Sequence, residues 1–347
     1  MSDVKSRPGV SPKGAAEAPG KRSASAALRA GAPWVAFLAF FIAYPFIWST
    51  PFQQTLGVLM VVYALYATGW NILGGMAGQI SLGHATFFGV GAYAQALGAR
   101  SGLNPWLSLL LGALIAVPIA VAIGYPVFRL KGHYFTIATI ATGEIFFLLV
   151  LNRAEWGGAD GLSIPTQPDS LIAMQWAGRQ KWEYHFLGLA LLVLALLAVV
   201  AMARSRVGFY LQAIRNNQEA ASSLGVDITR YKQIALACSA IVVSVAGSFF
   251  AQYVLFVDPF SVMSLDISIQ ITIVAVLGGV LSMWGPIVGA VVFVVLTEYT
   301  RIRFGGTGDA LNLVIYGGIV MLLAAFEPNG ILGVFSRFRR GGRKARS

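Results

Sequence analysis

Ionisable side chains are rare in the apolar parts of this chain, and two of them stand out. Glu144 and His84 lie within long apolar runs, where a carboxyl or an imidazole could contact a polar solute or pass on a proton. A proton relay would need further intramembrane acids or a basic partner, which argues against that role. Glu144 either forms hydrogen bonds to neighbouring helices or faces a solute path. For His84, a hydrogen-bonded position between helices is favoured over a role as a ligand.

Polar residues gather in a glycine-rich segment that contains Asn71, Gln79, Ser81 and His84. Glycine and polar side chains at membrane depth are typical either of tight helix packing or of a broken helix that lines a cavity. A second glycine-rich segment spans residues 277–289. The residues predicted to line a translocation path are Asn71, Gln79, Ser81, His84, Thr139 and Glu144.

A longer polar segment, residues 204–232, lies between two apolar runs. Its middle predicts a short helix: Asn216 or Asn217 can cap it, Glu219 falls in the first turn, and Gly225 ends it. So short a helix is marginal alone in water, and we expect a second protein to hold it. The alternative is an amphipathic helix that lies on the inner leaflet. The small apolar face of the helix consists of Ala220, Ala221 and Leu224.

The elements that must position these residues are membrane helices. The chain has 347 residues, of which 57% are hydrophobic and 11% charged. Its repeated apolar runs approach the roughly 20 residues that a helix needs to cross a bilayer. We predict an all-α polytopic membrane protein with about ten transmembrane helices and Gly-rich broken or re-entrant segments. The predicted spans are 33–49, 55–74, 81–99, 105–128, 134–151, 186–203, 233–256, 267–283, 285–302 and 309–326.

Most of the net charge of +11 lies in the two ends of the chain. We expect a disordered basic tail at residues 1–32, a transmembrane domain at 33–328 and a second basic tail at 329–347. Basic segments beside spans stay cytoplasmic and attract anionic membrane lipids. Ten crossings therefore put both termini and the 204–232 loop inside, and the loop 152–185 outside. Nucleic-acid binding is not expected.

Several of these segments, in this order, resemble LivM-type permeases of the branched-chain amino acid ABC-importer family. The resemblance covers most of residues 55–330. In the polar loop, Glu219-Ala220-Ala221 followed three residues later by Gly225 resembles the EAA signature of such permeases, although the usual Leu-Pro ending is absent. The other matching stretches read NILGGMAGQISLGHATFFGVGAY, HYFTIATIATGEI, GGADGLSIP and VLGGVLSMWGPIVGA.

The resemblance implies an ABC-importer permease that pairs with a second, LivH-like permease in a bacterial inner membrane. Two ABC ATPase subunits would bind the polar loop, and a soluble substrate-binding protein would dock on the outer side. The resemblance places ATP and Mg on the partner chains, so no cofactor, metal or catalytic residue is expected in this one. The residues that would couple to the ATPases are Glu219, Ala220, Ala221, Leu224 and Gly225.

The predicted function is ATP-driven import of branched-chain amino acids, or of a related small polar solute, by alternating access. One alternative is an ion-coupled secondary transporter or channel, which the scarcity of intramembrane acids disfavours. Another is an ABC importer for urea, short amides or aromatic acids. An integral-membrane enzyme is not expected, because we find no credible set of nucleophile, base and acid.

Overall fold

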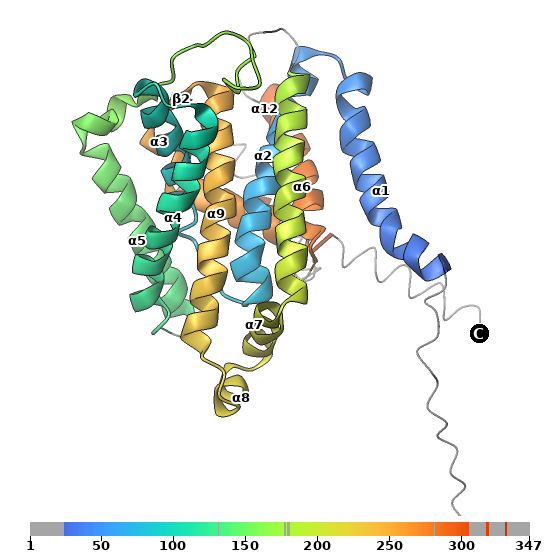
Figure 1. Cartoon of the computed structure of the whole chain (residues 1–347), viewed down its shortest axis with the longest axis vertical. Helices are drawn as coiled ribbons and strands as arrows, with labels where there is room; N and C mark the ends of the chain where they lie inside the picture. Colours follow the sequence, from blue (N-terminus) through green and yellow to red (C-terminus); the bar gives the residue numbers. More distant parts are fainter. Residues whose placement is uncertain are drawn as a thin grey trace, which may run out of the picture. The chain divides into compact units, whose positions relative to one another are not determined.

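The computed structural model describes residues 24–304 apart from 131, 177, 179, 180 and 281, together with 317, 318, 330 and 331. The chain divides into two compact units, residues 1–43 and residues 44–347. The described part of the first unit belongs to helix α1 (Ala24–Ile47). The second unit holds the other described helices and strands (Figure 1).

Helices dominate the second unit. The helices of the apolar runs are α2 (Pro51–Asn71), α3 (Ala85–Arg100), α4 (Pro105–Val127), α5 (His133–Leu151), α6 (Trp182–Arg204), α9 (Ile228–Val254), α11 (Leu265–Gly278) and α12 (Gly285–Phe304). The shorter elements are the π-helical turn η1 (Ile72–Met76), η2 (Ala154–Trp156), η3 (Gly158–Asp160), α7 (Arg206–Asn216), α8 (Gln218–Ser223), α10 (Pro259–Val262) and the antiparallel strands β1 (Leu162–Ser163) and β2 (Phe256–Val257).

Seven helical segments among the described residues are long and apolar enough to cross a membrane. The chain is therefore an all-α polytopic membrane protein, as predicted. The predicted span 309–326 and the tail 329–347 lie largely or wholly outside the described residues, so the count of ten stays a prediction. The seven segments are Pro51–Met76, Pro105–Val127, His133–Leu151, Trp182–Arg204, Ile228–Val254, Pro259–Gly278 and Gly285–Ile302.

Several predicted boundaries differ from the structure by a few residues or more. Helix α1 begins at Ala24, within the tail predicted to be disordered, in an alanine-rich stretch that favours helix. The predicted span 81–99 is an irregular stretch followed by α3, and the predicted span 267–283 ends early, with α11. Gly78 and Gly279 have φ angles of 67° and 119°, values that an α-helix does not contain and that favour glycine.

Several helix starts follow directly from local sequence. Thr50, Asn104 and Asp258 each accept a hydrogen bond through their side chains from a first-turn N–H group, at 3.3, 2.9 and 3.1 Å. Each is followed by a proline at the first helical position, where its missing N–H and fixed φ cost nothing. These caps fix where α2, α4 and α10 begin.

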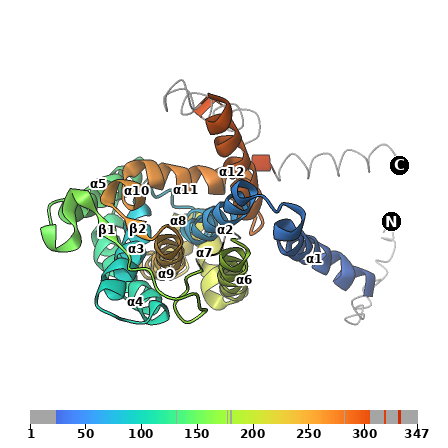
Figure 2. The ribbon, with the colours of Figure 1, turned by 90° about the horizontal axis from the view of Figure 1, so that it is seen from above.

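Helix α9 lies in the middle of the second unit, with α3 and α4 on one side and α2 and α6 on the other (Figure 2). Its contact with α3 is close because small residues meet there. A side chain at Gly91 would collide with the Ser244 carbonyl, and one at Gly247 with the Phe88 carbonyl. Small residues allow such close approach in membranes, where packing rather than water exclusion holds helices together. The packing places α9 against both halves of the broken helix described next.

Candidate functional site

The glycine-rich segment is a break in a membrane helix. Helix α2 continues into the π-helical turn η1, and the backbone then runs irregularly until α3 begins at Ala85. Backbone groups freed from a helix at membrane depth must find other partners. Here the partners come from distant helices: the Leu82 N–H donates to Thr139 Oγ1 at 3.0 Å, and the Ala85 N–H donates to Ser268 Oγ at 2.9 Å. The break is therefore fixed by α5 and α11.

His84 lies at the end of this break and is fully buried. Its Nε2 is 2.9 Å from Ser239 Oγ on α9, and its Nδ1 is 3.0 Å from Ser81 Oγ. The Ser239 hydroxyl donates to the Gly69 carbonyl at 2.7 Å, so it accepts from His84 Nε2–H. Nδ1 then accepts from the Ser81 hydroxyl. His84 therefore occupies the predicted hydrogen-bonded position between helices, joining the break to α2 and α9.

Asn71 connects the two glycine-rich segments. It is 7% exposed, and its Nδ2 donates to the carbonyl of Ser282 at 3.2 Å. Among the described residues, its Oδ1 has no hydrogen-bond partner. A side chain at Gly75 would collide with Asn71 Oδ1 and the Val280 carbonyl, so the segments are in close contact. The two glycine-rich segments, which are far apart in sequence, therefore meet in space.

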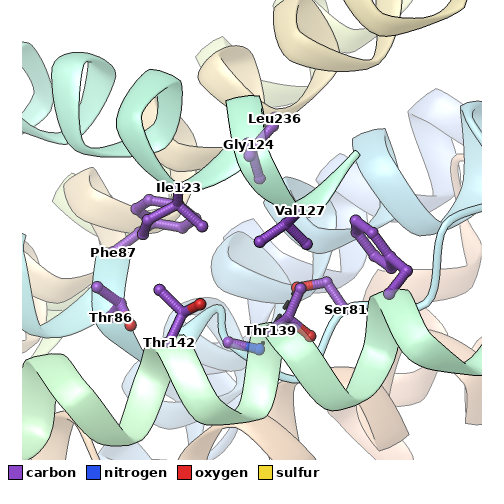
Figure 3. Close-up of a pocket in the computed structure, with 11 residues that line it drawn as sticks. Ser81, Thr86, Phe87, Ile123, Gly124, Val127, Thr139, Thr142 and Leu236 are labelled. Atoms are coloured by element: carbon purple, nitrogen blue, oxygen red, sulfur yellow. Dashed lines mark hydrogen bonds between the residues drawn. The ribbon is translucent and has the colours of Figure 1, made fainter. Parts of the chain in front are cut away.

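A small cavity lies where the break meets α3, α4 and α5 (Figure 3). Ser81, Thr86, Thr139 and Thr142 supply its polar lining, and Phe87 and Val127 are among its apolar neighbours. Thr86 Oγ1 is buried without a partner in the described part of the chain. The cavity volume is about 10 Å³, close to that of one water molecule and too small for an amino acid. In this conformation the cavity is closed to a solute of that size.

Two of the predicted path residues, Glu144 and Gln79, lie at least partly on the surface of the chain. Glu144 is exposed on α5, a helix of which only 17% is buried within the chain. The predicted hydrogen bonding of Glu144 to neighbouring helices is not found among the described residues. Gln79 is half-buried, and within the described part of the chain its side chain donates only to the adjacent Gly78 carbonyl, at 3.2 Å. The structure brings together Ser81, His84 and Thr139 through the contacts given above, whereas Asn71 contacts the second glycine-rich segment.

The polar loop folds into two helices rather than the one expected. The short predicted helix is present as α8: Asn217 Oδ1 accepts from the Ala220 N–H at 3.0 Å, and Gly225 ends the helix with φ +82°. Glu219 lies in its first turn. The prediction missed α7, although Ser205 caps it through the Gly208 N–H, at 3.4 Å. This serine followed by an amphipathic run was the available signal.

Helix α8 lies at one end of the helix bundle, opposite β2 and the segment 154–176 (Figure 1). Its predicted apolar face divides into two parts. Ala221 is 3% exposed and anchors α8 to the rest of the chain, whereas Leu224 is 85% exposed. Glu219 and Ala220 are exposed as well. A protruding capped helix with an uncovered leucine is suited to a protein partner.

At the opposite end, the predicted external loop is well anchored. Leu162 and Ser163 pair with Val257 and Phe256. Gln252 on α9, which is fully buried, donates through Nε2 to the Ala173 carbonyl at 2.7 Å. The loop is thereby fixed over the end of α9.

Comparison with known proteins agrees with this architecture. Residues 54–325 match the family described as "Branched-chain amino acid transport system / permease component". The chain is 30% identical over 321 residues to the high-affinity branched-chain amino acid transport system permease protein LivM of Salmonella typhimurium, and equally to that of Escherichia coli K12, covering 86% of this chain and 74% of each relative. It is 25% identical over 290 residues to the permease protein LivH of Salmonella typhimurium, covering 78% of this chain and 91% of the relative.

Proposed function

Because this chain belongs to the family of permease components of branched-chain amino acid transport systems, we propose that it forms half of the channel of an ATP-driven importer. The observation that carries the proposal is α8, a capped helix at one end of the membrane bundle with Leu224 uncovered. A secondary transporter has no use for such a helix, whereas an importer driven by separate ATPases needs one. The chain itself is a transport component and not an enzyme.

Two ABC ATPase subunits are proposed to act below the membrane, one of them on α8 of this chain. They would hold the ATP and Mg, so this chain needs no cofactor. ATP binding would draw the ATPases together and move α7 and α8, and the helices above would open to the other side. This orientation puts both basic tails on the cytoplasmic side of a bacterial inner membrane, beside anionic lipids. A soluble substrate-binding protein would dock at the opposite end, on residues 152–185.

Helix α5 is proposed to face a second, LivH-like permease. Its exposed surface is largely apolar, and Glu144 lies near the middle of the helix. A carboxyl facing lipid at that depth is costly, so such groups normally face protein or a water-filled path. The similarity of this chain to relatives named LivH supports a partner of the same fold. The surface of α5 includes the exposed residues Tyr134, Ile137, Glu144, Ile145, Leu148 and Leu149.

Leu, Ile and Val are the proposed substrates, in keeping with what the names of the relatives state. The purified binding protein, ATPases and both permeases, reconstituted in vesicles, are expected to take up labelled leucine. Uptake should fall about tenfold under a hundredfold excess of unlabelled isoleucine or valine, because one site would take all three. The same excess of urea, acetamide or phenylalanine should leave uptake unchanged. Competition by one of these instead would assign the chain to an importer for urea, short amides or aromatic acids.

Removing the charge of Glu144 is expected to slow transport without dissociating the complex. The Glu144→Gln variant keeps the shape of the side chain, but it loses the charge-assisted hydrogen bonds proposed for Glu144 with the second permease or in the path, worth about 1.5–3 kcal/mol each. Leucine uptake in vesicles should fall about tenfold or more. The matched control is Asp266→Asn, which removes a charge from an exposed position in the first turn of α11, outside residues 152–185. Full uptake by Glu144→Gln would contradict a place for Glu144 on the path.

A further inference from the structure

Arg215 links the polar loop to the broken helix. It lies in the last turn of α7, two residues before Asn217, the cap of α8. Its guanidinium Nη1 donates a hydrogen bond to the Gly75 carbonyl, at 2.8 Å. Gly75 belongs to η1, where α2 breaks. The two residues are 140 positions apart in sequence, so this contact is made only by the folded protein.

The chemistry of this contact follows from its place at a helix end. Carbonyl groups in the last turn of a helix lack intrahelical partners, and the end carries partial negative charge. A guanidinium group supplies both a donor and a positive charge. Nearby, the Leu73 carbonyl accepts instead from the Gln79 N–H, at 3.2 Å. Arg215 thus supplies a partner for the Gly75 carbonyl at the broken end of the helix, where carbonyl groups need partners from elsewhere in the chain.

The stem of Arg215 makes a second contact with the break. A Cβ atom added to Gly78 would lie 2.9 Å from Arg215 Cγ, so the stem lies against this glycine. Gly78 has φ +67°, which marks the sharp turn after η1. One side chain therefore contacts both sides of the turn, at Gly75 and at Gly78. A shift of α7 along its axis would therefore change at least one of these two contacts.

Space for such a shift lies beside the arginine. A cavity of about 380 Å³ is bounded by η1, α6, α7 and the second glycine-rich segment. Asn71 and Ser282, which join the two glycine-rich segments, line it together with Arg215. Part of the polar loop, the break after α2, the second glycine-rich segment and this open volume therefore meet at one point. Movement of the loop at this point would act on Gly75, which packs against Asn71. The backbone from Gly75 to His84 would carry it on to the hydrogen bonds of His84.

We infer that Arg215 is a positioning residue that transmits movement of α7 and α8 to the broken helix, and so couples ATP hydrolysis on the partner chains to opening of the path. This inference rests on the proposed function. It assigns Arg215 neither to the solute path nor to the ATPase-binding surface, which is formed by α8 and Leu224. Loss of Arg215 should therefore uncouple ATP hydrolysis from solute uptake, two activities that are coupled in the native complex.

The test uses the full complex in vesicles, with labelled leucine and ATP. Arg215→Ala is expected to retain its ATPase subunits and to hydrolyse ATP at the basal rate. Leucine uptake should fall at least about tenfold, and stimulation of hydrolysis by the leucine-loaded binding protein should disappear. Arg215→Lys, which keeps the charge and one donor, should restore uptake to at least about a third of the native level. Arg206→Ala, in the first turn of the same helix, is the matched control and should behave as the native complex.

Three results would overturn the inference. One is leucine uptake by Arg215→Ala at the rate of the native complex. Another is equal loss of uptake in Arg215→Ala and Arg215→Lys with the ATPases released, since this marks a structural role. The third is equal loss in Arg206→Ala, since this marks a general effect of loop charge. If the native complex itself takes up leucine without using ATP, the proposed function fails first, and the inference fails with it.

Discussion

The Leu224→Asp variant is expected to lose its ATPase subunits and, with them, all ATP-driven uptake. Leu224 is 85% exposed at the end of α8, and burial of a leucine side chain in a partner groove contributes about 1.5–3 kcal/mol. Aspartate forfeits this contribution and adds an unpaired buried carboxylate, which costs more. The dissociation constant should rise at least about a hundredfold, because each 1.4 kcal/mol corresponds to a factor of ten. Co-purification and titration of labelled ATPase onto the permease pair measure this directly.

The matched control for Leu224→Asp is Thr229→Asp. Thr229 is also exposed in the polar loop, but it lies in the first turn of α9, where an added negative charge suits the helix dipole. This variant should bind the ATPases as the native chain does. Because Leu224 contributes little to packing within the chain, its replacement should not change the yield of folded permease. Tight ATPase binding by Leu224→Asp would mean that α8 is not part of the surface that binds the ATPases.

The His84→Ala variant is expected to destabilise the permease by about 2–4 kcal/mol. It removes both hydrogen bonds of the ring and leaves a cavity in a fully buried position. The Ser81 hydroxyl loses its acceptor in the break, whereas Ser239 keeps its bond to the Gly69 carbonyl. Thermal unfolding in detergent should therefore occur at a lower temperature than in the native protein. Transport should fall as well, since the break and α9 are no longer joined.

A double-mutant cycle separates the hydrogen bond from the cavity. Ser239→Ala alone should destabilise the protein, but after His84→Ala it should cost less, by at least about 0.5 kcal/mol. His133→Ala is the control, because His133 is exposed at the start of α5 and should leave the unfolding temperature unchanged. Additive effects of the His84 and Ser239 substitutions would mean that the imidazole is held by packing alone.

Local signals in the sequence predicted much of this molecule. Runs of apolar residues indicated the membrane helices, and the composition around Asn217 and Gly225 indicated α8, because helix caps depend on neighbouring residues only. Helix α7 carried a similar signal at Ser205 and was overlooked. These elements depend on interactions within a few residues, and such interactions can be read from one sequence.

The helix break and its contacts depend on interactions that a single sequence does not reveal. The irregular stretch before α3 is held by Thr139 and Ser268, which are far from it in the chain. The contact between Arg215 and Gly75 likewise spans 140 positions. Glu144 was predicted as a candidate because of its depth, but its exposure within this chain depends on how α5 packs. Candidate site residues could thus be selected by their type and their depth in an apolar run. Which of them lie together in the fold could not be predicted.

The central claim is that this permease imports its solute at the expense of ATP hydrolysed by partner chains bound at α8. The most direct measurement is uptake of labelled leucine by vesicles that contain both permeases and both ATPases, with the loaded binding protein outside and ATP inside. The account predicts uptake that requires ATP and the binding protein, that persists when proton and sodium gradients are collapsed, and that disappears in Leu224→Asp. Uptake that follows an ion gradient and needs no ATP would contradict the account and establish an ion-coupled transporter.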